Sequence, residues 1–181
     1  MYLEPLVDDL LKMWNDGFQV WDEHEKEYFK LKGMLLTTIT DLPGRGCLSG
    51  EATKGYHGCV QCLDETDARW LTNSRKMVYM GHRRFLPMDH QYRRNKKSFD
   101  GTLELRKRPQ YRDGKEIHKE VRKLEVVLGK GKGKVAAPAD SLWKKRSCLW
   151  ELPYWRHFTV RHSLDAMHLT KNVCTSTLGT L

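Results

Sequence analysis

The spacing of hydrophobic residues predicts a helix at the start of the chain and strands after it. Apolar side chains recur every three or four positions from Leu3 to Trp14, as on one face of an amphipathic helix, and Gly17 supplies a stop signal. Residues 18–20 then alternate between apolar and polar, which is typical of a short strand. The run 34–40 is rich in Leu, Thr and Ile and favours a buried strand, although a buried helix segment has the same short apolar pattern.

The pattern is less regular farther along the chain. Five glycines within residues 42–62 predict a loop, and residues 63–76 are compatible with a short helix. Residues 82–97 are polar and predict an irregular stretch. Apolar positions at helical spacing predict another helix over 113–128, and the sequence becomes helical in pattern again from about Ser163.

Composition restricts the class of protein. The chain has 181 residues, enough for one domain or for one domain with an appendage. Its mean hydropathy is −0.67, and because no run of about 18 uncharged apolar residues occurs, we expect no membrane span. The acidic N-terminal segment is unlike a secretory signal. Five cysteines, odd in number and mostly isolated, indicate a reducing compartment.

Charge is distributed unevenly along the chain. Residues 1–28 contain eight acidic and two basic side chains, whereas residues 75–146 contain 22 Lys and Arg against eight Asp and Glu. A segment this basic attracts polyanions over roughly one Debye length, about 8–10 Å at physiological salt. DNA or RNA is therefore the natural partner, and a merely solubilising surface is the alternative.

Two basic clusters are the candidate nucleic-acid contacts. Their cations are Arg83, Arg84, Arg93, Arg94, Lys96 and Lys97. Phe85 and Tyr92 lie among them and would stack on unpaired bases while the cations grip phosphates. The alternative is that the aromatic rings anchor a core and the cations only solvate the surface. The second cluster also matches a nuclear import signal, which predicts a nuclear location.

Three residues are candidate metal ligands. Asp41 ends the apolar run 34–40, where it is either a metal-binding carboxylate or a turn residue before Pro43. Cys59 and Cys62 have the Cys-x-x-Cys spacing of a structural zinc site, of which they supply two of four ligands. A redox role fits less well, because no thioredoxin-like strand and helix surround the pair.

Several longer strings resemble those of the plant CACTA (En/Spm) transposases. They are Asp41-Leu42-Pro43 with Leu48-Ser49-Gly50, Cys59-x-x-Cys62, and residues 81–90, 93–97, 150–155 and 161–168. The likeness runs in order over nearly the whole chain. It implies a cut-and-paste transposase with an RNase H-like core, in which an Asp/Asp/Glu set holds two divalent cations for in-line attack on a phosphodiester.

The resemblance assigns roles to single residues. Asp41 is similar to the second of the three carboxylates, with Mg²⁺ or Mn²⁺ as the ion, and Cys59 and Cys62 are similar to structural Zn²⁺ ligands. In the family the first Asp precedes the segment that matches Met1, and the final Glu and a His pair follow Leu181. The chain is then an internal fragment, inactive alone. A non-catalytic nucleic-acid-binding relic of a transposon is the alternative.

The expected fold class is α/β (α+β), with a partial RNase H-like core, a largely irregular basic insertion and a C-terminal helix. The partial catalytic region with its Cys-x-x-Cys would span 1–74 and the basic insertion 75–128. A Gly/Lys linker would span 129–138, and an aromatic and helical segment 139–181. The expected partners are DNA at transposon ends and other transposase subunits, with no membrane.

Overall fold

The computed structural model describes residues 2–59, 62–127, 135–138 and 141–179. Helices and strands both occur there, so the mixed α+β class is confirmed. The strands of the described residues pair into three two-stranded sheets. The RNase H-like core stays a prediction.

The chain divides into two compact units, here called unit 1 and unit 2. Unit 1 consists of Met1–Gly50, Asp113–Pro138 and Trp143–Leu181, and unit 2 of Glu51–Arg112 and Ala139–Leu142. Unit 1 is therefore assembled from separate parts of the sequence, whereas nearly all of unit 2 is one continuous segment.

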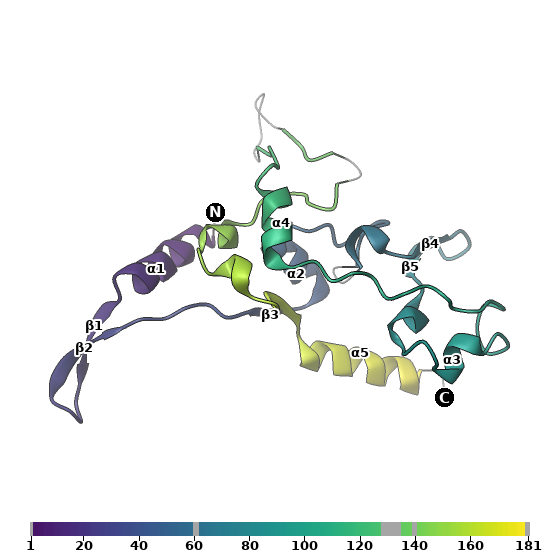
Figure 1. Cartoon of the computed structure of the whole chain (residues 1–181), viewed down its shortest axis with the longest axis horizontal. Helices are drawn as coiled ribbons and strands as arrows, with labels where there is room; N and C mark the ends of the chain where they lie inside the picture. The colour runs from purple at the N-terminus through teal and green to yellow at the C-terminus, as the bar shows by residue number, and fades with distance from the viewer. Residues whose placement is uncertain (1, 60–61, 128–134, 139–140, 180–181) are drawn as a thin grey trace. The chain divides into compact units, whose positions relative to one another are not determined.

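Unit 1 begins with the predicted helix and strand, both of which are confirmed. Helix α1 (Glu4–Asn15) has a proline in its first turn, where a missing N–H costs nothing. Gly17 follows with φ +72, a left-handed conformation that glycine adopts without strain. Strands β1 (Phe18–Asp22) and β2 (Glu27–Leu31) then form an antiparallel hairpin (Figure 1).

The core of unit 1 is built from aromatic residues near its C-terminal end. The 3₁₀ helices η3 (Cys148–Glu151) and η4 (Trp155–His157) follow each other closely, and Trp155, the first residue of η4, is 0% exposed. Tyr154 contacts Trp14 of α1, with ring centroids 4.7 Å apart. Rings of this size bury large apolar areas, which fixes α1 against the C-terminal segment.

Helix α4 (Gly114–Val121) covers another side of this core. Ile117 and Val121, one helical turn apart, are both buried. Asp113 and Glu116 close a capping box at the N-terminus, and Gly114 allows a close approach to the Arg156 carbonyl that a Cβ would prevent. The prediction of a helix over 113–128 is right at its start, but the helix ends at Val121.

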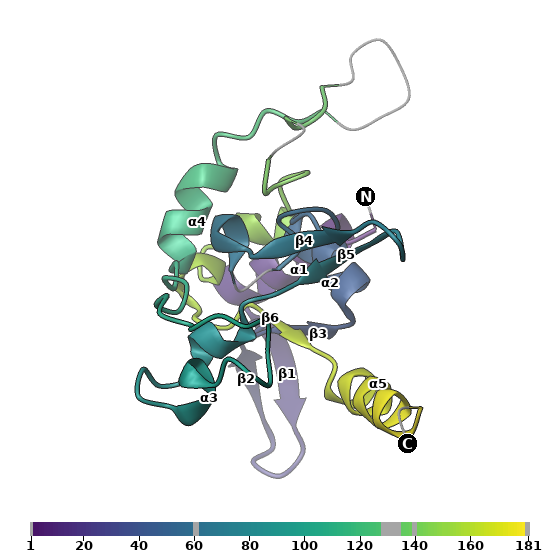
Figure 2. The same ribbon diagram turned by 90° about the vertical axis from the view of Figure 1, so that its right-hand side faces the viewer.

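A short parallel sheet joins the two ends of unit 1. Strand β3 (Thr38–Thr40) pairs with β6 (His162–Leu164), and the two lie side by side in Figure 2. Helix α2 (Leu42–Ser49) follows β3 and helix α5 (Ala166–Leu178) follows β6. The predicted buried strand over 34–40 is thus wrong in length and burial: only three residues pair, and the apolar Ile39 is 65% exposed.

Two other local predictions are also wrong. The glycine-rich loop begins with α2, because an aspartate cap and Pro43 start a helix that Gly44 and Gly46 do not prevent. The helix over 63–76 is instead the 3₁₀ helix η1 (Leu63–Glu65) followed by a hairpin. Its strands contain Trp70, Val78 and Tyr79, residue types that favour strands, and a polar turn separates them.

Unit 2 has little regular structure. The hairpin consists of β4 (Ala68–Leu71) and β5 (Lys76–Tyr79), and the short helices η2 (His82–Phe85) and α3 (Gln91–Arg94) follow it (Figure 2). An extended segment runs on through residues 103–112.

No helix of the described ranges is long and apolar enough to cross a membrane. Residues 129–134 of the predicted linker lie outside the described part, and Val127 and Val135 on either side of that gap form an antiparallel bridge. The predicted division at 74/75, 128/129 and 138/139 stays a prediction.

Candidate functional site

Asp41 lies at the carboxyl end of β3 and is the N-cap of α2. Its exposed side chain accepts a hydrogen bond from the Gly44 N–H at 2.7 Å, which satisfies one of the free donors of the first helical turn. A Cβ at position 44 would lie 2.7 Å from the same carboxylate oxygen, so the glycine leaves room for the cap. From the sequence, Asp41 was predicted to be either a metal ligand or a turn residue. In the structure the turn is the start of a helix, and capping that helix uses only one carboxylate oxygen.

Asp165 occupies the equivalent position on the neighbouring strand. It follows β6 directly, is the N-cap of α5, and accepts a hydrogen bond from the Met167 N–H at 2.9 Å. Its own N–H donates to the Thr40 carbonyl at 2.9 Å, which continues the β3–β6 pairing. Asp165 was not among the candidate residues found from the sequence. The usable signal was an aspartate just before the predicted C-terminal helix, the same arrangement that marked Asp41.

Asp41 and Asp165 thus lie at the same end of two adjacent parallel strands. Neighbouring strands are about 4.7–4.9 Å apart, and ligands of parallel sheets bind outside the carboxyl ends of the strands. In each carboxylate one oxygen accepts the hydrogen bond that caps the helix, and the other oxygen makes no hydrogen bond within the described residues. Mg²⁺ is commonly held by one or two carboxylates plus water and substrate phosphates, so the donor chemistry fits. No group of three or more metal-ligating side chains occurs in the described chain.

His162 holds β6 against β3 rather than adding a ligand. Its Nδ1 lies 2.7 Å from the Thr38 hydroxyl oxygen, in a hydrogen bond between paired strand residues. Burial, with Arg45 and Arg161 nearby, lowers the pKa of His162 from 6.5 to about 4. The imidazole is therefore neutral at physiological pH and has a structural role.

Cys59 and Cys62 are half-buried in unit 2, after a glycine-rich loop. The Tyr79 hydroxyl donates to the Gly55 carbonyl at 3.1 Å, which ties β5 to that loop, and the Leu63 N–H donates to the Cys59 carbonyl. Burial and a hydrogen bond with Cys59 raise the pKa of Cys62 to about 12, so without a metal its thiol stays protonated. The pair supplies half of a tetrahedral zinc site, and zinc binding stays a prediction.

Among the six predicted nucleic-acid contacts, Arg93 is the most deeply buried, at 2% exposure. Its guanidinium donates to four backbone carbonyls at 2.8–3.0 Å. The acceptors belong to Arg84, Leu86, Glu104 and Arg106. One side chain thus joins η2 and α3 to the extended segment after residue 102. Arg93 therefore has a structural role in unit 2.

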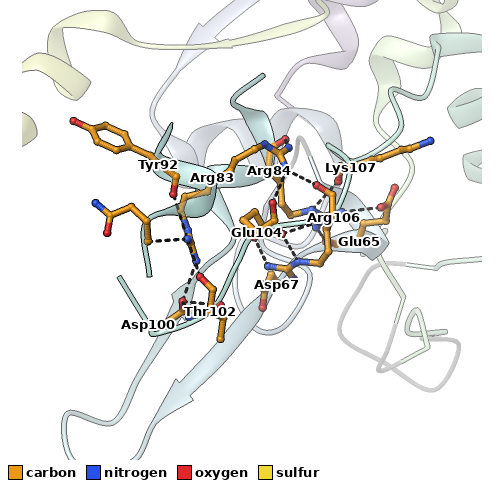
Figure 3. Close-up of polar contacts among 12 residues, drawn as sticks. Glu65, Asp67, Arg83, Arg84, Tyr92, Asp100, Thr102, Glu104, Arg106 and Lys107 are labelled. Atoms are coloured by element: carbon orange, nitrogen blue, oxygen red, sulfur yellow. Dashed lines mark hydrogen bonds and ion pairs between the residues drawn. The ribbon is translucent and has the colours of Figure 1, made fainter. Parts of the chain in front are cut away.

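Arg84 and Arg83 have similar structural roles. Arg84 is buried, donates to the carbonyls of Lys107 and Glu65, and pairs with the Glu65 carboxylate at 3.0 Å. Arg83 pairs with Asp100 at 2.9 Å, and its guanidinium carbon lies 4.5 Å from the centre of the Phe99 ring. Figure 3 shows the Arg84 guanidinium turned toward Glu65 and Lys107, and the Arg83 guanidinium turned toward Asp100.

A buried carboxylate completes this network (Figure 3). Glu104 is 4% exposed and accepts three hydrogen bonds from Arg106, one from its backbone N–H and two from its guanidinium, which also reaches Asp67 at 2.7 Å. The pKa of Glu104 is lowered chiefly by its hydrogen bonds with Arg106, and the pKa of Arg106 is raised by the same partner. The charges of Arg83, Arg84 and Arg106 are therefore compensated by carboxylates within unit 2, and few of their donors are left for a ligand.

The remaining three predicted contacts have no such partners. Arg94, Lys96 and Lys97 are exposed, and within the described residues their side chains make no hydrogen bond or ion pair. Their cations are accessible to phosphate. The six residues of the sequence prediction thus divide by structure into three embedded arginines and three accessible cations.

The chain matches the sequence model described as transposase family tnp2 over residues 1–124, more than half of its length. It belongs to this family of transposases, as the resemblance implied. No curated protein and no solved structure matches it.

Proposed function

We propose that this transposase domain is of the CACTA (En/Spm) type and takes part in metal-dependent cleavage and strand transfer at the DNA ends of a transposon. The observation that supports it is the pair of aspartates, Asp41 and Asp165, at the carboxyl ends of two adjacent parallel strands. Carboxylates gathered at such an edge are suited to hold divalent cations against a phosphodiester.

In this proposal each aspartate has two tasks. One oxygen of Asp41 caps α2 and fixes the side chain's direction, and its second oxygen is left for a cation. Asp165 does the same at α5. A bound Mg²⁺ or Mn²⁺ would neutralise charge on the phosphate oxygens and activate the attacking hydroxyl or water. Two carboxylates leave coordination positions open for water, DNA and any further acid.

The accessible cations of unit 2 would contribute DNA binding. Residues 51–112 contain 14 Lys and Arg against seven Asp and Glu, and Arg94, Lys96 and Lys97 are exposed without partners in the described chain. Each phosphate contact makes affinity more sensitive to salt. A nuclear location and association with other transposase subunits belong to the same proposal, as does zinc at Cys59 and Cys62.

The test uses Asp41→Asn, because asparagine is also a good N-cap and preserves the helix start. Mn²⁺ binding to the chain is measured by titration, and cleavage of labelled duplex DNA is followed with Mg²⁺ or Mn²⁺. We expect Asp41→Asn and Asp165→Asn each to weaken Mn²⁺ binding about ten-fold, since each removes one charged ligand. Asp89→Asn, at an exposed acid of unit 2, is the control. Equal Mn²⁺ affinity in all four proteins would eliminate the metal role of this pair.

A second candidate function is nucleic-acid binding without catalysis, which the basic segment 75–146 favours. In that case the chain binds DNA with an affinity that falls steeply with salt, while Asp41→Asn changes neither affinity nor any metal-dependent reaction. Metal-dependent cleavage that Asp41→Asn removes would reject this candidate.

A further inference from the structure

Unit 2 contains a hollow of about 420 Å³ whose walls are half cationic and half apolar. Its lining is Arg84, Phe85, Leu86, Pro87, Met88, Arg93, Lys107 and Arg108. The volume falls within the range of about 300–1,000 Å³ that is typical of ligand pockets. All of these residues belong to unit 2, so the hollow is a property of that unit alone.

The four cations of the hollow have two different roles. Arg84 and Arg93 are buried and spend their donors on backbone carbonyls and Glu65. Lys107 and Arg108 are exposed, and their side chains have no hydrogen bond or ion pair within the described residues. Figure 3 shows Lys107 extending away from the ion pairs that surround the buried arginines. Within the described residues the hollow thus has two accessible cations whose side chains make no hydrogen bond or ion pair.

The buried arginines fix the backbone that carries these two cations. Arg93 binds the carbonyls of Glu104 and Arg106, and Arg84 binds the carbonyl of Lys107 itself. Side chains on a backbone held at successive carbonyls lose less freedom on binding than side chains on a free loop. The hydrogen bonds that occupy Arg84 and Arg93 therefore also preorganise the hollow.

The apolar wall of the hollow comes from the end of η2 and the turn after it. Phe85 is 47% exposed and Met88 is 55% exposed, although both are large apolar side chains. An aromatic face beside unpaired cations is the combination by which proteins bind single-stranded nucleic acid, since a base stacks on the ring while the cations contact the backbone. An acidic peptide would use the cations but has no group that needs the ring.

We propose that this hollow binds an unpaired nucleotide of single-stranded DNA, with the base against Phe85 and the adjacent phosphates on Lys107 and Arg108. A base within a duplex is stacked on its neighbours and cannot reach the ring. The site is separate from the aspartate pair and needs no metal. It adds to the proposed function a position for a frayed or melted DNA end.

The test measures binding of the whole chain to a fluorescently labelled oligothymidylate of about 12 nucleotides, within the span of single-strand-binding folds. Anisotropy titrations are made in EDTA at several salt concentrations, so that failure of the metal proposal leaves this result unaffected. A duplex of the same length and a polyglutamate peptide are the competitors. Two pairs of variants with matched controls separate the charges from the ring.

The charge variant is Lys107→Gln with Arg108→Gln, and its control is Lys54→Gln with Arg69→Gln, which removes the same charge from exposed positions of unit 2 outside the hollow. We expect the first to reduce the salt slope by about 1.4, at about 0.7 for each lost phosphate contact on single strands. The control should reduce single-strand affinity much less. An equal loss in both would indicate diffuse attraction and overturn the proposal.

The ring variant is Phe85→Leu, and its control is Trp70→Leu on β4, where the exposed ring (49%) is outside the hollow. Loss of stacking should weaken oligothymidylate binding about five-fold or more with no change in salt slope. Trp70→Leu should leave affinity unchanged. Tighter binding of the duplex, or equal displacement by polyglutamate, would show that no unpaired base is bound.

Discussion

The buried Arg93 offers the sharpest test of how unit 2 is held together. Arg93→Gln removes a guanidinium that donates to four backbone carbonyls. A hydrogen bond from a charged donor contributes about 1.5–3 kcal/mol, so a simple sum would reach roughly 6–12 kcal/mol. Glutamine regains one bond and water reaches part of the gap. We therefore expect a loss of about 3–5 kcal/mol, the usual cost of breaking a buried charged network.

That loss is comparable to the whole stability of the unit. Folded domains have roughly 0.05–0.15 kcal/mol of stability per residue, or about 3–9 kcal/mol for a segment of this size. Amide hydrogen exchange measured over residues 82–107 should show protection lost in Arg93→Gln. The matched control is Arg94→Gln, at the next residue, where the exposed side chain has no partner in the described chain. Equal exchange in the two variants would refute the structural role.

Three further predictions concern other groups. Asp41→Ala should cost unit 1 about 1 kcal/mol by loss of the cap, whereas Asp41→Asn should cost less than about 0.5 kcal/mol; equal urea midpoints would argue against capping. His162 has its pKa lowered from 6.5 to about 4, so its contribution is complete above pH 6.5 and is lost as pH falls toward 4, up to about 3 kcal/mol; the pH dependence should flatten in His162→Gln. Cys62, whose pKa is raised to about 12, should react with iodoacetamide at pH 8 far more slowly than exposed Cys47, and a faster reaction would contradict its burial.

The sequence predicted those elements whose pattern is complete within the element itself. Helix α1 has a clear apolar stripe and β1 alternates, so both were found from the sequence. The hairpin β4–β5 was missed, because a four-residue run of mixed charged and apolar residues fits a helical turn equally well until its partner strand is known. The short α2 was hidden by its glycines, and only its cap and proline indicated it.

The candidate site shows the same limit for a different reason. Asp41 was found because it ends a β-branched run, but Asp165 acquires its meaning only from a strand pairing more than 120 residues away. Likewise, nothing in the string Arg93-Arg94 tells which arginine is buried. That depends on which carbonyls of the segment 103–108 come within reach. Charge is visible in a sequence, whereas its internal compensation is not.

The division of unit 1 along the chain has a consequence during translation. Its first fifty residues emerge from the ribosome long before residues 162–164, with which β3 must pair, and contacts so distant in sequence form slowly. Unit 2, nearly contiguous, has all but a few of its residues available much earlier. During synthesis unit 2 would then be folded while the parts of unit 1 on either side of it in the sequence are not. The β1–β2 hairpin leaves the large apolar side chains Trp21, Tyr28 and Phe29 exposed even in the folded structure, so this surface is accessible throughout that interval.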